Sequence, residues 1–427
     1  MLGLLRAAGH AIVPDVGQAR GVLVNTCGFI ADAAQEGVNA ILRYADMRAQ
    51  GRLDALVVTG CLAQRYRGEM MDEIPEIDAL VGTGDFGAVV EAFNRVEHGE
   101  KPSYIGEPGW LAPEGTPRVV STPKHYAYVK VSEGCSNRCS YCLIPSLRGP
   151  QVDRKSEAIV AEVERLAAQG VVEAILVAQD TTAYGRSLYG KPSLAGLLRE
   201  VCSVPGIEWV RVLYTYPSLI SEELIDVFAS EPKLLPYMDI PMQHGSDRIL
   251  RAMRRQITRQ GMIDVCNKLR RRIPGLVIRT SLIVGFPGET DEDFTDLMTF
   301  IDEIRPERAG VFVFSPEEGT PAADLPDQIA PSLARERRGI AMERLAQISR
   351  QFGESRIGSI QRVLVDGPSS ESELLCVARS YAEAPDVDGS VYVGDATLRA
   401  GQFVDVRITD AVEYDIAGEP LEPIAEV

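Results

Sequence analysis

The chain has 427 residues, of which 45% are apolar and 25% are charged, as in ordinary globular proteins. This length corresponds to two or three domains, and 44 basic against 61 acidic residues give a net charge of −17. Such a charge argues against a broad, non-specific grip on nucleic acid, and the lack of any long apolar run or leader-like segment predicts a cytoplasmic protein without membrane spans.

Short apolar runs alternate with helical patterns in residues 1–98. Strands are predicted at 21–26 and 55–59, and helices at 31–48 and 88–96, where apolar residues recur at helical spacing. Continuous apolar strands separated by helices indicate a parallel sheet that is covered on both faces. This region is therefore predicted to be an α/β domain.

A stretch rich in proline and glycine follows. Residues 99–123 hold five prolines and four glycines without periodicity, which predicts a linker. Strand-then-helix alternation resumes in residues 124–352, with strands predicted at 126–131, 174–179, 209–216, 237–242, 277–284 and 310–314. Six such units are too few for a closed eight-stranded barrel, so we expect an open, partial (β/α)6 barrel with functional residues at the carboxyl ends of its strands.

The last region has a different pattern. Between residues 361 and 415, short alternating segments are separated by Gly, Pro and Asp, which predicts a small antiparallel β-barrel at residues 355–427. The predicted fold class is thus α/β, with an N-terminal parallel sheet, a partial barrel and a small all-β barrel.

Three cysteines, Cys135, Cys139 and Cys142, occur within eight residues just after the first strand of the partial barrel. Eight cysteines in the whole chain are too few for a disulfide scaffold, so the clustering indicates metal or redox chemistry in a reducing compartment. Structural zinc requires four ligands, whereas three thiolates suit a cubane iron-sulfur cluster with one open iron. A zinc loop completed by a distant ligand is the alternative.

Further candidate residues follow predicted strands. Gln179 ends the second barrel strand, and Gly285 and Glu289 belong to a glycine turn after the fifth, where backbone can approach a cofactor closely. Cys27 and Cys61 each follow a buried strand of the first sheet, so they should lie at one edge and share a metal. For Gly285 and Glu289 the alternative is an ordinary turn without a ligand. For Cys27 and Cys61 it is two small buried residues without a metal.

The CxxxCxxC loop from Cys135 to Cys142 resembles that of radical S-adenosylmethionine enzymes. The resemblance implies that these cysteines hold a 4Fe-4S cluster whose open iron binds S-adenosylmethionine, which one electron cleaves to a 5′-deoxyadenosyl radical. The segments VNTCGF and VTGCLA, around Cys27 and Cys61, resemble the N-terminal domain of methylthiotransferases, which binds a second 4Fe-4S cluster through three cysteines. The first of those three would precede Met1, so we expect a truncated start and an incomplete second cluster.

Several stretches resemble the RimO branch of that family, which modifies an aspartate of small-subunit ribosomal protein twelve. They are CLIPSLRG (142–149), DIPMQH (239–244), FSPEEGT (314–320) and ARSYAEAP (378–385). The resemblance assigns residues 1–98 to the methylthiotransferase domain, 124–352 to the radical SAM core and 355–427 to a TRAM domain.

The charge of the last region supports this branch. Residues 360–427 contain 14 acidic residues, 4 arginines and no lysine, so they should repel a phosphate backbone and attract a basic ribosomal protein. A merely solubilising acidic surface is the alternative. The arginines between 251 and 272 lie on helical stretches and are expected to form a solvated face rather than an RNA contact.

The resemblance also implies a mechanism with two molecules of S-adenosylmethionine. One gives a methyl group to a sulfur at the cluster of Cys27 and Cys61, and the other yields the radical that removes hydrogen from the β-carbon of the substrate aspartate. A flavodoxin or ferredoxin donor, a monomeric state, and the free ribosomal protein or assembled small subunit as partner are implied, with no transfer RNA. Two other functions stay open: a transfer RNA adenosine methylthiotransferase, and a degenerate iron-sulfur protein.

Overall fold

The structure is a computed structural model in which residues 1–421 are described. The chain divides into two compact units, and each is described by itself. The first unit combines residues 1–121 with 132–154 and 315–325, and the second contains 122–131, 155–314 and the chain from Pro326 onward. The three-cysteine loop thus packs with the N-terminal region, although the sequence pattern assigned it to the barrel.

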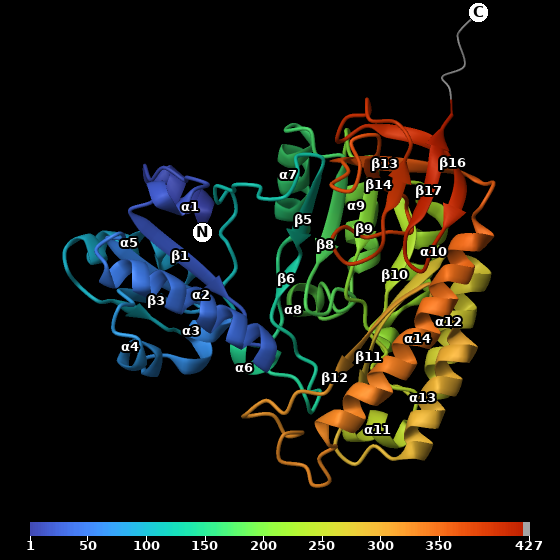
Figure 1. Ribbon diagram of the computed structural model, residues 1–427, viewed down its shortest axis with the longest axis horizontal. Helices are drawn as coiled ribbons and strands as arrows, with labels where there is room; N and C mark the ends of the chain where they lie inside the picture. The colour runs from blue at the N-terminus through green and yellow to red at the C-terminus, as the bar shows by residue number, and fades with distance from the viewer. Residues whose placement is uncertain (422–427) are drawn as a thin grey trace, which may run out of the picture. The chain divides into compact units, whose positions relative to one another are not determined.

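A four-stranded parallel sheet forms the centre of the first unit (Figure 1). Its strands, in spatial order, are β1 (Gly21–Thr26), β2 (Ala55–Gly60), β3 (Ala79–Val81) and β4 (Ser103–Tyr104). The first two confirm the predicted strands. The expected linker at 99–123 needs a correction, because β4 lies within it and pairs with β3.

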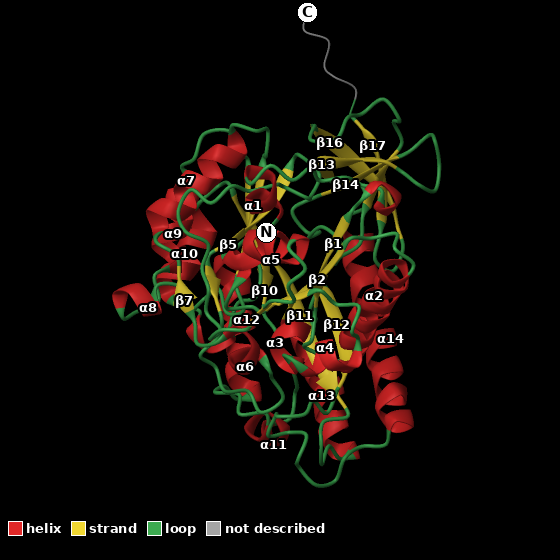
Figure 2. Ribbon diagram, turned by 90° about the vertical axis from the view of Figure 1, so that its left-hand side faces the viewer, coloured by secondary structure: helices red, strands yellow, loops and turns green. Residues whose placement is uncertain are grey.

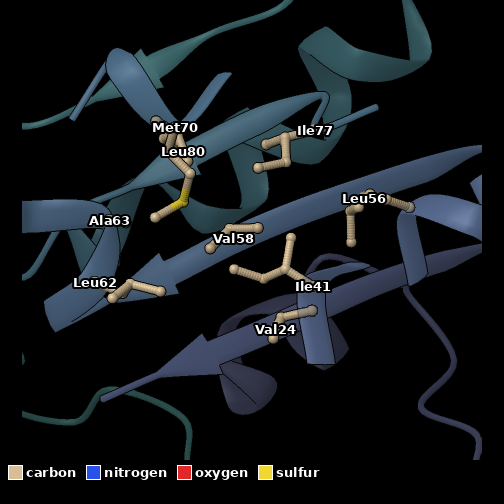
Figure 3. Packing of buried hydrophobic residues seen from close by; sticks show 10 residues of the cluster. Val24, Ile41, Leu56, Val58, Leu62, Ala63, Met70, Ile77 and Leu80 are labelled. Atoms are coloured by element: carbon tan, nitrogen blue, oxygen red, sulfur yellow. The ribbon is translucent and has the colours of Figure 1, made fainter. Parts of the chain in front are cut away.

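Helices cover this sheet. They are α1 (Leu2–Ala7), α2 (Ala31–Ala49), α3 (Cys61–Tyr66), α4 (Glu69–Glu73) and α5 (Val89–Glu97), with 3-10 turns at Val16–Gln18 and Phe86–Ala88. Figure 3 shows Val24, Leu56 and Val58 of the strands packed against Ile41 of α2. The apolar positions that predicted these elements therefore form one core, which fixes the edge of the sheet where Cys27 and Cys61 lie.

The second unit contains a six-stranded, all-parallel sheet, as expected for a partial barrel. From one edge to the other its strands are β12 (Arg308–Val313), β11 (Val277–Val284), β10 (Leu234–Asp239), β9 (Trp209–Val212), β8 (Glu173–Val177) and β5 (Tyr126–Lys130). Each predicted barrel strand is present. Only β11 has the predicted bounds, and the other five differ in extent. β9 ends four residues early because Tyr214 turns left-handed, and β10 ends before Pro241, which has no N–H to donate.

The helices of this unit lie between and beside the strands, and α14 runs along β12 (Figure 1). They are α7 (Ser156–Ala167), α8 (Arg186–Tyr189), α9 (Leu194–Cys202), α10 (Glu222–Ser230), α11 (Asp247–Ala252), α12 (Arg259–Arg272), α13 (Asp291–Ile304) and α14 (Pro331–Ser355), with a 3-10 turn at Pro217–Leu219. A capping box between Thr290 and Asp293 starts α13, since each residue accepts the other's backbone N–H.

Five strands close into the small C-terminal barrel, four of them labelled in Figure 2. Around the barrel they are β13 (Ile360–Pro368), β14 (Cys376–Arg379), β15 (Val391–Val393), β17 (Ile416–Pro420) and β16 (Phe403–Ala411). The prediction of an antiparallel barrel is corrected at one pair, because β15 and β17 run parallel and an odd number of strands cannot alternate all round. The last residues of the predicted 355–427 segment, 422–427, lie outside the described residues.

Residues 379–388, which begin at the last residue of β14, lie against the starting ends of the partial barrel's strands, and we call them the floor loop. Tyr126, the first residue of β5, donates to Asp386, and Arg211 of β9 donates to the carbonyl of Tyr381. Arg379 at the start of the floor loop donates to Glu173 at 2.7 Å, and Arg211 of β9 donates to the same carboxylate at 2.9 Å. All three side chains are almost completely buried. The C-terminal barrel is therefore joined to the partial barrel through a buried ion pair.

Candidate functional site

The three-cysteine loop is held at its base by a short antiparallel pair, β6 (Ser132–Glu133) with β7 (Val152–Asp153). Cys135 N–H also donates to the carbonyl of Gly149 at 3.1 Å. Gly134 has a φ of +75°, and a Cβ placed there would lie 2.4 Å from the carbonyl oxygen of Pro150. Only glycine fits this position, so the loop folds back tightly on itself.

The thiols of this loop differ in exposure. Cys135 is buried, whereas Cys139 and Cys142 are half-buried, and the backbone N–H of Ile144 donates to the sulfur of Cys142 at 3.4 Å. Ile144 begins α6 (Ile144–Arg148). Backbone donors aimed at sulfur are a means by which proteins stabilise bound iron-sulfur clusters.

The donor set of the loop suits a cluster. Three thiolates can each bind a different iron of a cubane and leave one iron open, whereas structural zinc requires four ligands. Within residues 1–421, no three His, Cys, Asp or Glu side chains form a preformed site for a single metal ion. The three thiols and the constrained loop therefore fit a 4Fe-4S cluster.

Cys27 and Cys61 occupy equivalent places at one edge of the first sheet. Thr26 pairs with Gly60 in the parallel register, so each cysteine follows directly on a paired residue. Cys27 is exposed and Cys61 is buried. A Cβ on Gly28 would lie 3.1 Å from the carbonyl carbon of Cys61, so the two segments approach closely.

Arg148, at the end of α6, links the two groups of cysteines. Its Nε donates to the sulfur of Cys61 at 3.2 Å, and its Nη1 lies 3.3 Å from the carboxylate of Glu133. Burial disfavours the guanidinium charge, but Cys61 and Glu133 outweigh this effect and raise the pKa of Arg148. Arg148 was not among the predicted site residues, although an arginine shortly after the third cysteine was a signal that could have identified it.

Glu317 is a second residue that sequence reasoning missed, although its stretch was noted. It belongs to the first unit, where its carboxylate accepts from the N–H of Ala31 and from Arg65, each at 2.7 Å. Burial would raise its pKa, but hydrogen bonds from Ser315, Arg65 and Ala31 lower it. As a charged carboxylate, Glu317 thus anchors the first residue of α2, which follows Cys27, and the side chain of Arg65 in α3, which begins at Cys61.

In the second unit, the predicted cofactor residues lie at the carboxyl ends of strands. Gln179 follows β8 by two residues and is half-buried. Gly285 directly follows β11 with a φ of +73°, and a Cβ there would lie 2.5 Å from the Cβ of Ala334. Both the backbone conformation and the crowding require glycine at this turn.

Glu289 shapes this turn from inside. One of its oxygens accepts from Gly285 N–H at 2.8 Å, and the other accepts from Arg337 at 2.8 Å. His244, which is fully buried, places its Nε2 3.5 Å from the carboxylate. The carboxylate of Glu289 therefore holds the backbone of this turn in place through Gly285 N–H.

The remaining cysteines are unsuitable as substitute ligands. Cys202 and Cys266 lie on α9 and α12, and burial raises the pKa of each thiol to about 12. Cys376 of β14 is also buried. Burial disfavours the thiolate form, which is the form that binds iron, in each of them.

The arginines of residues 251–272 are largely engaged within the protein. Arg255 is buried and donates to the carbonyl of Pro241 at 2.6 Å, and Arg259 and Arg270 pair with Glu303 and Glu307 at 2.8 and 2.9 Å. The expectation of a solvated face is thus wrong for Arg255, whereas Arg259 and Arg270 are partly exposed. Pairing with carboxylates makes Arg259 and Arg270 less available to bind phosphate.

No helix among residues 1–421 combines the length and apolar character needed to cross a membrane.

Three family models match the chain: the Radical SAM superfamily at residues 129–301, the TRAM domain at 357–421, and the uncharacterized protein family UPF0004 at 1–82. The three matches lie in the N-terminal region, the partial barrel and the C-terminal barrel, respectively for UPF0004, Radical SAM and TRAM.

Similar proteins extend the comparison. A solved radical S-adenosylmethionine methyltransferase, TsrM from Kitasatospora setae, is similar in fold, with a TM-score of 0.55 and 17% identity over 82% of this chain and 70% of that one. Two relatives carry the name ribosomal protein uS12 methylthiotransferase RimO. The one from Trichlorobacter lovleyi is 46% identical over 99% of this chain and 94% of its own, and the one from Pelobacter propionicus is 47% identical over 98% and 93%. The chain therefore belongs to the RimO family of radical SAM methylthiotransferases.

Proposed function

We propose that this enzyme attaches a methylthio group to the β-carbon of an aspartate in ribosomal protein uS12, using two molecules of S-adenosylmethionine and two 4Fe-4S clusters. The observation that carries the proposal is the near full-length similarity to relatives that bear the name of this activity. The β-carbon of an aspartate is too weakly acidic for a side-chain base to deprotonate. A radical route removes the hydrogen atom instead.

Cys135, Cys139 and Cys142 would hold the first cluster. When bound there, a 4Fe-4S cluster with an open iron supplies the electron that cleaves S-adenosylmethionine. The chain's own contribution is to hold the three thiolates on one constrained loop, with the N–H of Ile144 directed at Cys142. Gln179 and the turn of Gly285 and Glu289 would orient S-adenosylmethionine at the strand ends.

Cys27 and Cys61 would hold two corners of the second cluster, and Arg148 would neutralise part of the charge on Cys61. Replacing either cysteine should spare cleavage of S-adenosylmethionine but stop insertion of sulfur. Iron analysis after anaerobic reconstitution distinguishes the two sites: about four irons indicate the first cluster alone, and about eight indicate both.

The exposed charge of the C-terminal barrel supports a basic protein partner. Its outward carboxylates are Glu371, Glu373, Asp386, Asp405, Asp410, Glu413 and Glu419, against the exposed arginines Arg362, Arg399 and Arg407. Asp366, Glu383 and Asp388 are engaged in internal ion pairs, so the outward field is weaker than the sequence count suggested. It is still negative, which disfavours transfer RNA and steers a basic protein.

The remaining parts of the proposal concern the cell. We infer a cytoplasmic, monomeric enzyme that receives electrons from a flavodoxin or ferredoxin and acts on uS12, free or in the small ribosomal subunit. The acidic barrel supports the partner, and the thiolate-based sites require a reducing compartment.

A competition experiment tests the substrate. The reconstituted enzyme receives S-adenosylmethionine labelled in its methyl group, together with equal amounts of uS12 and transfer RNA. We expect the label in uS12, and uptake should fall as salt rises because screening shortens the range of the acidic field. Label in transfer RNA instead would contradict the proposal.

A further inference from the structure

Tyr214 has an unusual backbone conformation at the carboxyl end of a barrel strand. It follows β9 by two residues and has a φ of +60°, a region that residues with a Cβ rarely adopt. For a bulky aromatic residue this conformation is unfavourable and persists only where the surroundings impose it. Residues of this kind concentrate at active sites and ligand-binding sites.

Two hydrogen bonds impose the conformation. The N–H of Tyr214 donates to a carboxylate oxygen of Asp239 at 3.0 Å, and its carbonyl accepts from Thr181 N–H at 2.9 Å. Asp239 ends β10 and is buried, so its position is determined by the strand. Tyr214 is therefore held from both neighbouring strand ends, on the β8 and β10 sides.

Asp239 is itself held by a chain of charges that begins in the floor loop. Arg279 of β11 donates to Asp239 at 2.9 Å and lies 3.5 Å from Asp388. Asp388 also accepts from the hydroxyl of Tyr237 at 2.6 Å. Because these groups are buried and paired, the chain is rigid, and the C-terminal barrel contributes to the position of Tyr214.

The side chain of Tyr214 is accessible to solvent. It is 46% exposed, although Leu213 and Thr215 on either side are 5% and 2% exposed. Its hydroxyl makes no hydrogen bond to any residue within 1–421. A large aromatic ring with a free donor thus stands where the functional residues of such barrels lie.

We propose that Tyr214 contacts the polypeptide substrate, with its ring against the substrate chain and its hydroxyl donating to a substrate oxygen, and that Asp239 is its positioning residue. The inference rests on the proposed function, since it takes uS12 as the polypeptide. Tyrosine suits this role because it presents a rigid, amphipathic surface at low conformational cost. Its ring face also suits the cationic side chains of a basic protein.

Kinetics with the full-length, reconstituted enzyme test the contact. Tyr214→Ala should raise the KM for uS12 about tenfold, which corresponds to about 1.4 kcal/mol, and Tyr214→Phe should raise it by a smaller factor, because only the hydroxyl is lost. The matched control is Tyr189→Ala on α8, where the tyrosine is 51% exposed, and its KM should not change. Cleavage of S-adenosylmethionine without uS12 should be equal in all four proteins.

A double-mutant cycle tests the positioning role. Asp239→Asn should also raise the KM for uS12, and adding it to Tyr214→Ala should cause little further change, since both act through one contact. Direct binding of uS12 to the same proteins, followed by anisotropy, should weaken in parallel with the rise in KM.

Three outcomes overturn the inference. The first is an unchanged KM in the Tyr214 variants of an enzyme whose wild type modifies uS12, which leaves the proposed function intact. The second is loss of substrate-free cleavage in Tyr214→Ala, which makes Tyr214 a cofactor contact. The third is a wild type that neither binds nor modifies uS12, which removes the proposed function as well.

Discussion

Glu383→Gln should lower the free energy of unfolding by about 3–5 kcal/mol, because it weakens the packing of the C-terminal barrel against the radical SAM core. The carboxylate of Glu383 is completely buried and accepts from Arg308 and Arg356, each at 2.7 Å, and from Ser380 N–H at 3.0 Å. Glutamine has nearly the same volume but no charge. The substitution therefore leaves two buried guanidinium groups without their counter-ion.

The lowered pKa of Glu383 gives a second value for the free energy of the same interaction. Burial would raise the pKa of Glu383, but Arg356 and Arg308 outweigh burial and lower it from 4.5 to about 2. At about 1.4 kcal/mol per pKa unit, this difference corresponds to about 3 kcal/mol. Because the pKa is lowered on folding, the stabilisation is complete above about pH 5 and is lost as the pH falls towards about 2.

The fluorescence of Trp209 reports the packing of the C-terminal barrel against the radical SAM core. Its ring lies 4.9 Å from that of Phe403 in the C-terminal barrel, and Trp110→Phe leaves it as the sole tryptophan of the chain. Urea unfolding is followed by Trp209 emission at pH 7 and at lower pH, with and without Glu383→Gln. The control is Glu419→Gln, an exposed residue of the same barrel with no side-chain hydrogen bond or ion pair to residues 1–421.

The expected result is a large loss of stability at pH 7 in Glu383→Gln and a flatter response between pH 5 and 2. The Glu419→Gln control should change the free energy of unfolding by less than about 0.5 kcal/mol. A loss below about 1 kcal/mol in Glu383→Gln, as for a surface ion pair, would refute the reasoning.

Other predictions address the cofactor sites and the partner. Gly285→Ala should destabilise by about 2 kcal/mol in thermal unfolding, because its φ is +73° and the new Cβ overlaps Ala334, whereas Gly196→Ala on α9 has open space and should not destabilise. Cys139→Ala should abolish 5′-deoxyadenosine formation and lower the iron content, and Cys202→Ala should change neither; normal 5′-deoxyadenosine formation in Cys139→Ala would refute the assignment. Glu373→Lys with Glu371→Lys should slow uS12 association more than it speeds dissociation, measured by stopped flow; an unchanged association rate would contradict steering by the acidic barrel.

The elements that the sequence predicted well are those with long periodic patterns. The strand at 277–284 was predicted at its observed bounds, because eight residues of alternating and apolar character leave little choice. The strands β3 and β4 have three and two residues, too few to show a period. Their existence depends on pairing with β2 and with each other.

The contacts around the cysteines could not be predicted in the same way. The residue types and spacing of the loop were sufficient to predict cluster ligands, since the spacing restricts that chemistry. Arg148 and Cys61 are 87 positions apart, and Arg65 and Glu317 are 252 apart. Such pairs arise from tertiary packing, on which a local pattern carries no information.

The left-handed turn at Tyr214 also could not be predicted from the local sequence. The apolar pattern predicted a strand to 216, and nothing local signals the turn, because it is imposed by Asp239 and Thr181 from neighbouring strand ends. Propensity favours an extended tyrosine, and the tertiary hydrogen bonds override it.

The central claim is that the enzyme removes a hydrogen atom from the β-carbon of a uS12 aspartate and places a methylthio group there. The most direct test uses uS12 whose aspartates carry deuterium at the β-carbon, with the reconstituted enzyme, S-adenosylmethionine and a reductant. Mass spectrometry should find deuterium in the 5′-deoxyadenosine and the methylthio group on one aspartate of uS12. A 5′-deoxyadenosine without deuterium, formed while uS12 stays unmodified, would contradict the account.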